Sequence, residues 1–103
     1  MEGFSKVARR DEIAQGEMKL VDVGNEQIVL ANLGDRIVAF NNACPHAECD
    51  LAFGLLEGDE LTCDCHGSRF NVRSGALLEG PALEPLTQYA VRLEGNDLLL
   101  GPR

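Results

Sequence analysis

Short apolar stretches separated by turn signals recur along the whole chain. The stretch Ile37-Val38-Ala39-Phe40 is continuously apolar, which is typical of a buried strand in a β-sandwich. The pairs Gly24-Asn25 and Gly95-Asn96 separate neighbouring stretches and favour tight turns. The predicted strands cover residues 3–8, 18–23, 27–32, 36–41, 60–62, 69–72, 76–78, 88–94 and 97–100.

Amphipathic helices are almost absent from this pattern. The exception is a short turn or helical turn bracketed by Arg9 to Glu12 and by Gln15-Gly16, with Asp11 as its expected cap. Further turns are expected at Glu57-Gly58-Asp59 and at Asn71 to Gly75, each followed by another strand. Many short strands with frequent turns predict an all-β fold, an antiparallel β-sandwich.

Length and charge narrow the class of protein. A chain of 103 residues is large enough for one hydrophobic core, so we expect a single domain over residues 1–103. The formal net charge is −8, which argues against nucleic-acid binding because that needs a basic surface. An acidic surface suits docking to basic patches on protein partners. No run is long and apolar enough to span a membrane, and no signal peptide is apparent.

The candidate chemistry is concentrated between residues 44 and 68. All four cysteines and both histidines of the chain lie there. Cys44 and His46 are separated by one residue, Cys63 and His66 by two, and 16 residues lie between His46 and Cys63. Thiolates and imidazoles in such pairs are metal ligands, and both iron–sulfur and zinc sites use them.

This spacing resembles that of the Rieske-type iron–sulfur proteins, whose pattern is C-x-H, about 15–17 residues, and C-x-x-H. The resemblance implies one [2Fe–2S] cluster, with Cys44 and Cys63 on one iron and His46 and His66 on the other. It also implies a β-sandwich with an inserted cluster-binding subdomain at about residues 43–72. Neutral imidazoles in place of two thiolates raise the potential to about −150 to +300 mV, against about −400 mV for all-cysteine plant-type clusters.

The remaining cysteines, Cys49 and Cys65, resemble the extra pair of the high-potential Rieske proteins of cytochrome bc complexes. There the pair forms a disulfide that ties the two cluster-binding loops together. A Cys49–Cys65 bridge here would close a loop of 15 intervening residues, worth roughly 3 kcal/mol by the chain-entropy model. The alternative is two free thiols buried beside the cluster. A disulfide would be unusual in the cytoplasm unless the cluster shields it.

The residues around the predicted ligands match the high-potential subfamily only in part. Ser68 stands where that subfamily has a serine that bonds a bridging sulfide, and Phe70 stands where it has a tyrosine. Hydrogen bonds to sulfur raise the potential, so one bond instead of two predicts an intermediate value. The alternative is that Ser68 caps a turn and Phe70 fills the core. Gly80-Pro81 resembles the Gly-Pro loop that covers the cluster from a third side.

The run Phe70 to Leu86 resembles the ferredoxin components of bacterial ring-hydroxylating dioxygenase systems. That resemblance implies a one-electron carrier, taking electrons from a flavin-dependent reductase and passing them to a terminal oxygenase or similar redox enzyme. We expect a cytoplasmic monomer without membrane attachment and without catalysis of its own. A Rieske oxygenase needs a further iron held by two histidines and a carboxylate, and the chain has no histidines to spare.

Two other functions stay open at this point. The chain could be the small Rieske subunit of a larger oxidoreductase, such as a nitrite reductase or an arsenite oxidase. More distantly, the same cysteines and histidines could form a structural zinc module, although zinc fingers pair cysteine with cysteine and histidine with histidine.

Overall fold

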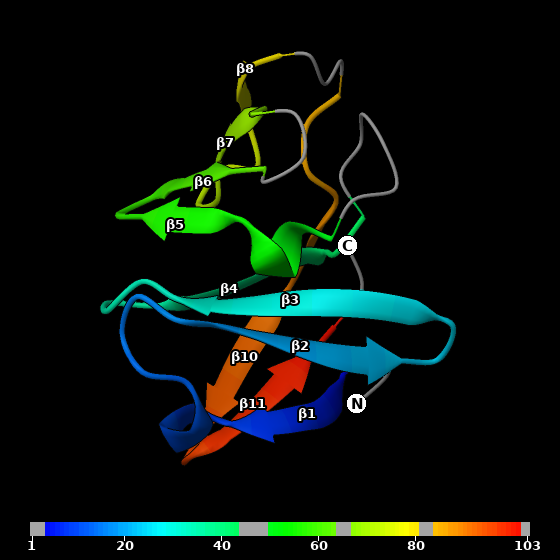
Figure 1. Cartoon of the computed structure of the whole chain (residues 1–103). Helices are drawn as coiled ribbons and strands as arrows, with labels where there is room; N and C mark the ends of the chain where they lie inside the picture. Colours follow the sequence, from blue (N-terminus) through cyan, green and yellow to red (C-terminus); the bar gives the residue numbers. More distant parts are fainter. Residues whose placement is uncertain (1–3, 44–49, 64–66, 81–83, 102–103) are drawn as a thin grey trace.

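The computed structural model describes residues 4–43, 50–63, 67–80 and 84–101 (Figure 1). In these ranges the chain forms eleven strands and two 3-10 turns. The strands are β1 Ser5–Arg9, β2 Met18–Val23, β3 Glu26–Asn32, β4 Ile37–Asn41, β5 Leu55–Glu57, β6 Glu60–Thr62, β7 Arg69–Asn71, β8 Leu77–Glu79, β9 Gln88–Tyr89, β10 Val91–Glu94 and β11 Asp97–Leu100; the 3-10 turns are η1 Arg10–Glu12 and η2 Leu51–Phe53. The predicted all-β antiparallel class is confirmed.

The strands form three antiparallel sheets. A central sheet has the order β2-β3-β4-β9, a three-stranded sheet has the order β1-β11-β10, and a third sheet has the order β5-β6-β7-β8. Figure 1 shows the central sheet between the other two, with β5 to β8 on one side and β1, β10 and β11 on the other.

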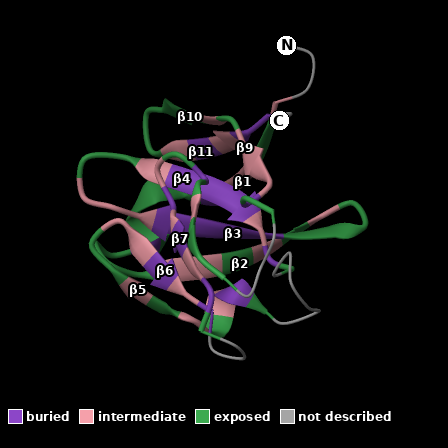
Figure 2. Ribbon diagram, turned by 90° about the horizontal axis from the view of Figure 1, so that it is seen from above, coloured by how far each residue is buried: buried purple, intermediate pink, exposed green. Residues whose placement is uncertain are grey.

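Strand β3 is buried on both faces, which explains why its sequence is apolar without alternation. Ile28 and Leu30 belong to the core cluster shared with the three-stranded sheet. Val29 and Ala31 belong to the cluster shared with the third sheet. Successive side chains of a strand point to opposite faces, so one run of residues contributes to both cores. Figure 2 shows the resulting buried band along β3 and β4.

The third sheet is inserted into the central sheet. Strand β4 pairs with β9 through Phe40 and Gln88, so the chain leaves the central sheet after β4 and returns at β9. We call residues 43–80 the inserted unit. Its inner row packs onto the core of the central sheet; this row is Leu56, Leu61, Phe70 and Leu77. Strand β8 belongs to this sheet as well. The bounds of about 43–72 for the cluster-binding subdomain stay a prediction.

Two local expectations were wrong. Asp11 does not cap the first 3-10 turn, because it lies inside the turn and Arg9 occupies the cap position. The Glu12 carboxylate instead accepts a hydrogen bond from the Arg9 backbone N–H at 3.3 Å. The strand predicted over residues 88–94 is divided at Ala90, where the chain crosses from the central sheet to the three-stranded sheet. Among the described residues, no helix has the length and apolar character to cross a membrane.

Candidate metal centre

The first predicted ligand loop lies between two segments that the structure describes. Cys44, His46 and Cys49 themselves lie outside the described residues. Ala43 and Asp50 form an antiparallel bridge, and the Leu51 N–H donates to the Asn42 carbonyl at 2.8 Å. The described segments on either side of residues 44–49 are therefore held side by side.

Two asparagines that precede this loop hold its frame. The Asn42 side chain is buried; its Oδ1 accepts from the Ala52 N–H at 3.0 Å, and its amide donates to Gln27 at 3.3 Å. The Asn41 Oδ1 accepts from the Ala43 N–H at 2.9 Å. These bonds tie the start of the loop to η2 and to the central sheet. Sequence reasoning missed both residues, although asparagine is enriched in such side-chain-to-backbone turns.

The second predicted ligand loop is closed by its own backbone. The Cys63 N–H donates to the Ser68 carbonyl at 2.8 Å, and the Gly67 N–H donates to the Cys63 carbonyl at 3.0 Å. Gly67 has φ +77°, a left-handed conformation that glycine adopts without strain. Cys63 follows β6 directly and Ser68 precedes β7, so two paired strands present this loop. Cys65 and His66 lie outside the described residues.

The described site residues in this loop are buried. Cys63 is 1% exposed and Ser68 is 0% exposed. Among the described residues, Cys63 is a free and buried cysteine. Thiols buried beside apolar side chains are shielded from water, as a metal centre in a protein interior requires.

The backbone after the first loop packs tightly against the strand that leads to the second. A Cβ on Gly54 would lie 2.4 Å from the Thr62 carbonyl oxygen and 3.2 Å from the Leu51 carbonyl oxygen. Glycine is therefore required where η2 meets the end of β6. Because Thr62 immediately precedes Cys63, this contact brings the two loop frames together.

Of the remaining predicted site residues, Phe70 and Gly80 lie in the described part of the chain and Pro81 does not. Phe70 is 0% exposed and belongs to the same buried cluster as Cys63, so it fills the core as one of the two interpretations expected. Gly80 is exposed at the end of β8, and Pro81 lies outside the described residues. Whether Gly80-Pro81 covers the cluster stays a prediction, as does the role of the Ser68 hydroxyl.

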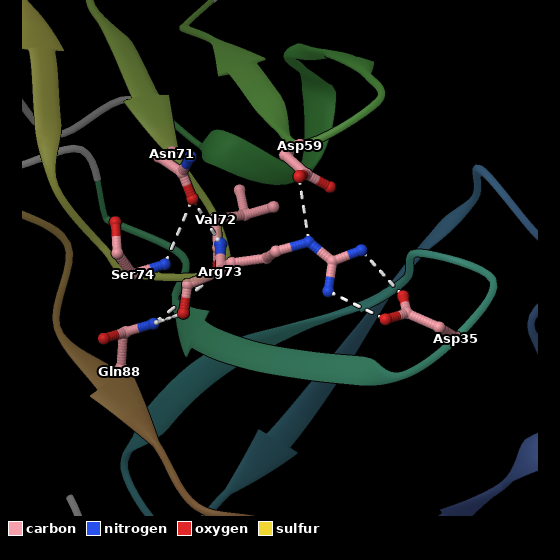
Figure 3. Close-up of polar contacts among 7 residues, drawn as sticks. All are labelled: Asp35, Asp59, Asn71, Val72, Arg73, Ser74 and Gln88. Carbon is pink, nitrogen blue, oxygen red and sulfur yellow. Dashed lines mark hydrogen bonds and ion pairs between the residues drawn. The ribbon is translucent and has the colours of Figure 1, made fainter.

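Arg73 connects the inserted unit to the central sheet (Figure 3). Its guanidinium makes a bidentate contact with the Asp35 carboxylate at 2.7 and 3.0 Å. Its Nε lies 2.8 Å from the Asp59 carboxylate. Asp35 belongs to the β3–β4 connection and Asp59 to the β5–β6 turn, so one side chain bridges both parts. The hydrogen bond from Arg73 lowers the pKa of Asp35, and the two carboxylates raise the pKa of Arg73.

The backbone at Arg73 is fixed from a second direction. The Gln88 amide donates to the Arg73 carbonyl at 3.0 Å and to the Val72 carbonyl at 3.4 Å, and Gln88 belongs to β9 of the central sheet. Asn71 Oδ1 accepts from the backbone N–H groups of Arg73 and Ser74 at 2.8 and 3.1 Å. Figure 3 shows these contacts around the turn between β7 and β8. Sequence reasoning did not single out this arginine, because its partners are distant in the chain.

Known proteins match both the sequence and this architecture. A family model described as the Rieske [2Fe-2S] domain matches residues 3–90. The chain belongs to the Rieske [2Fe–2S] family. Members bind one Rieske-type [2Fe–2S] cluster through two cysteines and two histidines, so this protein carries that cluster rather than zinc.

Two relatives that are similar to this chain over nearly their whole length are ferredoxin components of dioxygenases. The ferredoxin component of biphenyl 2,3-dioxygenase from Rhodococcus jostii RHA1 is 36% identical over 97 residues, which cover 94% of this chain and 91% of the relative. The biphenyl dioxygenase ferredoxin subunit of Pseudomonas sp. KKS102 is 34% identical over 98 residues, covering 94% and 90%.

Solved Rieske structures share the fold. The ferredoxin of carbazole 1,9a-dioxygenase from Nocardioides aromaticivorans IC177 has a TM-score of 0.91 and 31% identity, covering 99% of this chain and 100% of its own. A ferredoxin in complex with the oxygenase of a carbazole 1,9a-dioxygenase has a TM-score of 0.90 and 26% identity, covering 98% and 94%. A putative nitrite reductase small subunit has a TM-score of 0.79 at 18% identity, with 94% and 96% covered, which shows the fold alone.

The donor set of this Rieske protein fits the cluster that the family carries. The chain offers one C-x-H pair and one C-x-x-H pair, of which the described member, Cys63, is a buried thiol at a strand end. The described segments that flank the two ligand loops are closed by backbone hydrogen bonds, and they contact each other where Gly54 packs against Thr62. A rigid frame of this kind keeps ligands in fixed positions, which a metal centre needs.

Proposed function

We propose that this Rieske protein is a one-electron carrier that passes electrons to a terminal oxygenase. The observation that supports this most directly is the full-length likeness to dioxygenase ferredoxins, in sequence at 36% identity and in structure at a TM-score of 0.91. The likeness covers 94% of this chain and 91% of the sequence relative, and 99% and 100% of the two chains in the structural comparison. We further infer that electrons arrive from a flavin-dependent reductase.

We assign the cluster ligands to Cys44 and Cys63 on one iron and His46 and His66 on the other. The buried thiol of Cys63 and the closed frames of both loops support this assignment. When bound, the [2Fe–2S] cluster supplies reversible uptake and release of one electron. We also propose a Cys49–Cys65 disulfide between the two loops and a hydrogen bond from Ser68 to the cluster.

The protein's own residues keep the ligand loops in place. Asn42 fixes the entry to the first loop, Gly54 allows η2 to contact β6, and Arg73 connects the inserted unit to the central sheet. Leu51, Leu61 and Phe70 pack in the same buried cluster as Cys63, which keeps water from that side of the Cys63 thiol. The geometry of a preorganised and shielded site changes little when the cluster gains or loses one electron, and this favours fast electron transfer.

Electron paramagnetic resonance of the dithionite-reduced protein tests the cofactor assignment. We expect a rhombic signal with an average g-value near that of the family, and we expect His46→Ala and His66→Ala to lose it. An unchanged signal in both variants would remove these histidines from the ligand set. The matched control is Glu26→Ala, which truncates an exposed side chain on β3 and should keep the signal.

Electron transfer tests the function itself. Reduced protein is mixed anaerobically with the terminal oxygenase component of the biphenyl 2,3-dioxygenase of Rhodococcus jostii RHA1, and the spectral changes of both clusters are followed. We expect oxidation of this protein to accompany reduction of the oxygenase. Failure to reduce that oxygenase while the protein shows a normal Rieske spectrum would contradict the proposal. Stable co-purification with a large chain would instead indicate the subunit of a larger oxidoreductase.

A further inference from the structure

Three large apolar side chains of the inserted unit are exposed to solvent. Phe53 is 71% exposed, Leu55 is 58% exposed and Leu78 is 47% exposed. Among the described residues, two other large apolar side chains are exposed, Leu20 on β2 and Leu93 on β10. Exposed apolar residues that occur singly are ordinary, so the position of these three relative to the predicted site decides whether they have a role.

The three exposed residues lie next to the frames of the predicted cluster loops. Phe53 is the last residue of η2, which follows the bridge that closes the first loop. Leu55 pairs with Thr62, the residue before Cys63. Phe53 and Leu55 flank Gly54, whose backbone packs against the Thr62 carbonyl.

Leu78 lies on the other side of the second loop. The sheet order is β5-β6-β7-β8, and the second loop connects the two middle strands. Leu55 belongs to one edge strand and Leu78 to the other. Leu78 sits at the irregularity where Arg69 pairs with Glu79 and Phe70 pairs with Leu77. Apolar side chains therefore stand at both edges of the sheet that presents Cys63.

The inserted unit also holds most of the negative charge. Residues 43–80 contain seven carboxylates, two arginines and no lysine, a net charge of −5, whereas the remaining 65 residues have a net charge of −3. Both arginines are already paired: Arg69 with Glu60 and Glu79, and Arg73 with Asp35 and Asp59. A cationic partner would meet carboxylates here and no uncommitted arginine.

We propose that Phe53, Leu55 and Leu78, with the carboxylates around them, form the docking surface for the terminal oxygenase. We call these three residues the apolar docking patch. The inference rests on the proposed function and assigns a site to it. The matching surface on the oxygenase has an apolar centre surrounded by lysine and arginine. Apolar contact supplies affinity, while opposite charge orients the partners and speeds their encounter.

The first experiment compares two equally exposed leucines, one in the inserted unit and one in the three-stranded sheet. Leu78→Ser is tested against Leu93→Ser, since these leucines are 47% and 48% exposed. The second-order rate constant for reduction of the biphenyl 2,3-dioxygenase oxygenase component is measured by stopped flow. We expect Leu78→Ser and Phe53→Ser each to lower it roughly tenfold, and Leu93→Ser to change it less than about twofold. The resonance spectrum and the potential should be the same in all variants.

The second experiment tests the charge of the surface. Glu57→Gln, at the end of β5, is compared with Asp22→Asn on β2; both carboxylates are exposed, and neither makes an ion pair among the described residues. Raising the salt from about 20 to about 300 mM should slow the wild-type reaction because it screens the attraction. Glu57→Gln should be slower at low salt and less sensitive to salt, while Asp22→Asn should behave like the wild type.

Each result other than the expected one shows which part of the proposal is wrong. Equal effects of Leu78→Ser and Leu93→Ser would overturn the docking surface while leaving the proposed function intact. A loss confined to reduction by a flavoprotein reductase would show that the reductase docks here instead. Conversion of a dimer to a monomer by Phe53→Ser, with the rate unchanged, would show that a second copy covers the patch. No transfer by the wild-type protein would contradict the proposed function itself.

Discussion

Asn42 is a buried polar residue with a structural task beside the first ligand loop. Its amide oxygen accepts from the Ala52 N–H, and its amide nitrogen donates to Gln27. Alanine at this position would remove both bonds and leave the Ala52 N–H without its side-chain partner. We expect Asn42→Ala to destabilise the fold by about 1–3 kcal/mol and to lower the iron content of the purified protein.

Thermal unfolding followed by circular dichroism, together with iron and acid-labile sulfide per chain, checks this prediction. Asn25→Ala is the control, because Asn25 is exposed in the β2–β3 turn. An Asn42→Ala protein as stable and as fully loaded as the control would show that the first loop does not depend on this side chain.

Phe70 occupies the position at which high-potential Rieske proteins have a tyrosine. It is fully buried in the cluster of residues that includes Cys63. If the added hydroxyl of Phe70→Tyr reaches a cysteine sulfur, it stabilises the reduced cluster, so we expect a higher reduction potential. Protein-film voltammetry measures that potential. A lowered or unchanged potential with a lower Tm would instead show a buried hydroxyl without a partner.

The residues that could be foreseen are those whose chemistry depends on local spacing. The spacing of cysteine and histidine predicts a ligand set that stays a prediction, whereas Cys63 was correctly expected directly after a strand. Asn42 could not be foreseen, because its importance depends on a contact with Ala52 that only the folded chain creates. Phe70 gave two interpretations that spacing alone could not separate, and its burial supports the core role.

At the scale of secondary structure, the contact between η2 and β6 joins the two ligand loops. Gly54 lies in this contact, and a methyl group there would overlap the Thr62 carbonyl oxygen. Backbone cannot yield as a flexible side chain can, so η2 would have to move away from β6. We expect Gly54→Ala to cost about 1–3 kcal/mol of stability and to reduce cluster loading.

Gly24→Ala separates the clash from the general effect of replacing a glycine. Gly24 has φ +63°, and no atom lies within 4 Å of the position that an added methyl group would occupy, so the cost there is local backbone strain of about 1 kcal/mol. Gly24→Ala should therefore unfold at a lower temperature but keep full iron content. If Gly54→Ala also kept its iron, the contact would matter for stability and have no role at the ligand loops.

The strands themselves were largely predictable, and their exceptions have a physical cause. Alternating and continuous apolar runs gave β2, β3 and β4 nearly to the residue, because burial on one or both faces leaves that pattern. The division at Ala90 was missed, since β9 and β10 follow each other directly in the chain while pairing with different sheets. Pairing partners are a property of the tertiary fold and leave no local signal.

At the scale of the whole molecule, the ion pair of Arg73 with Asp35 connects the inserted unit to the central sheet. Arg73 lowers the pKa of Asp35 by its hydrogen bond. A carboxylate with a lowered pKa stabilises the folded state above its unfolded-state pKa of about 3.9, and this contribution is lost as the pH falls through the lowered value. The stabilisation should therefore be present at neutral pH and disappear in acid.

Asp35→Asn tests this dependence. At pH 7 and low salt we expect its Tm to lie roughly 2–4 °C below that of the wild type, a small effect because the Asp35 side chain is 64% exposed and solvent screens the pair. As the pH falls from about 4 through the lowered pKa of Asp35, the two curves should converge, since the wild-type carboxylate becomes protonated and neutral. Asp22→Asn, which removes an exposed carboxylate without an ion pair among the described residues, should show no such convergence. A difference between wild type and Asp35→Asn that persists unchanged into acid would mean that Arg73 holds the inserted unit through Asp59 and the Gln88 hydrogen bonds rather than through Asp35.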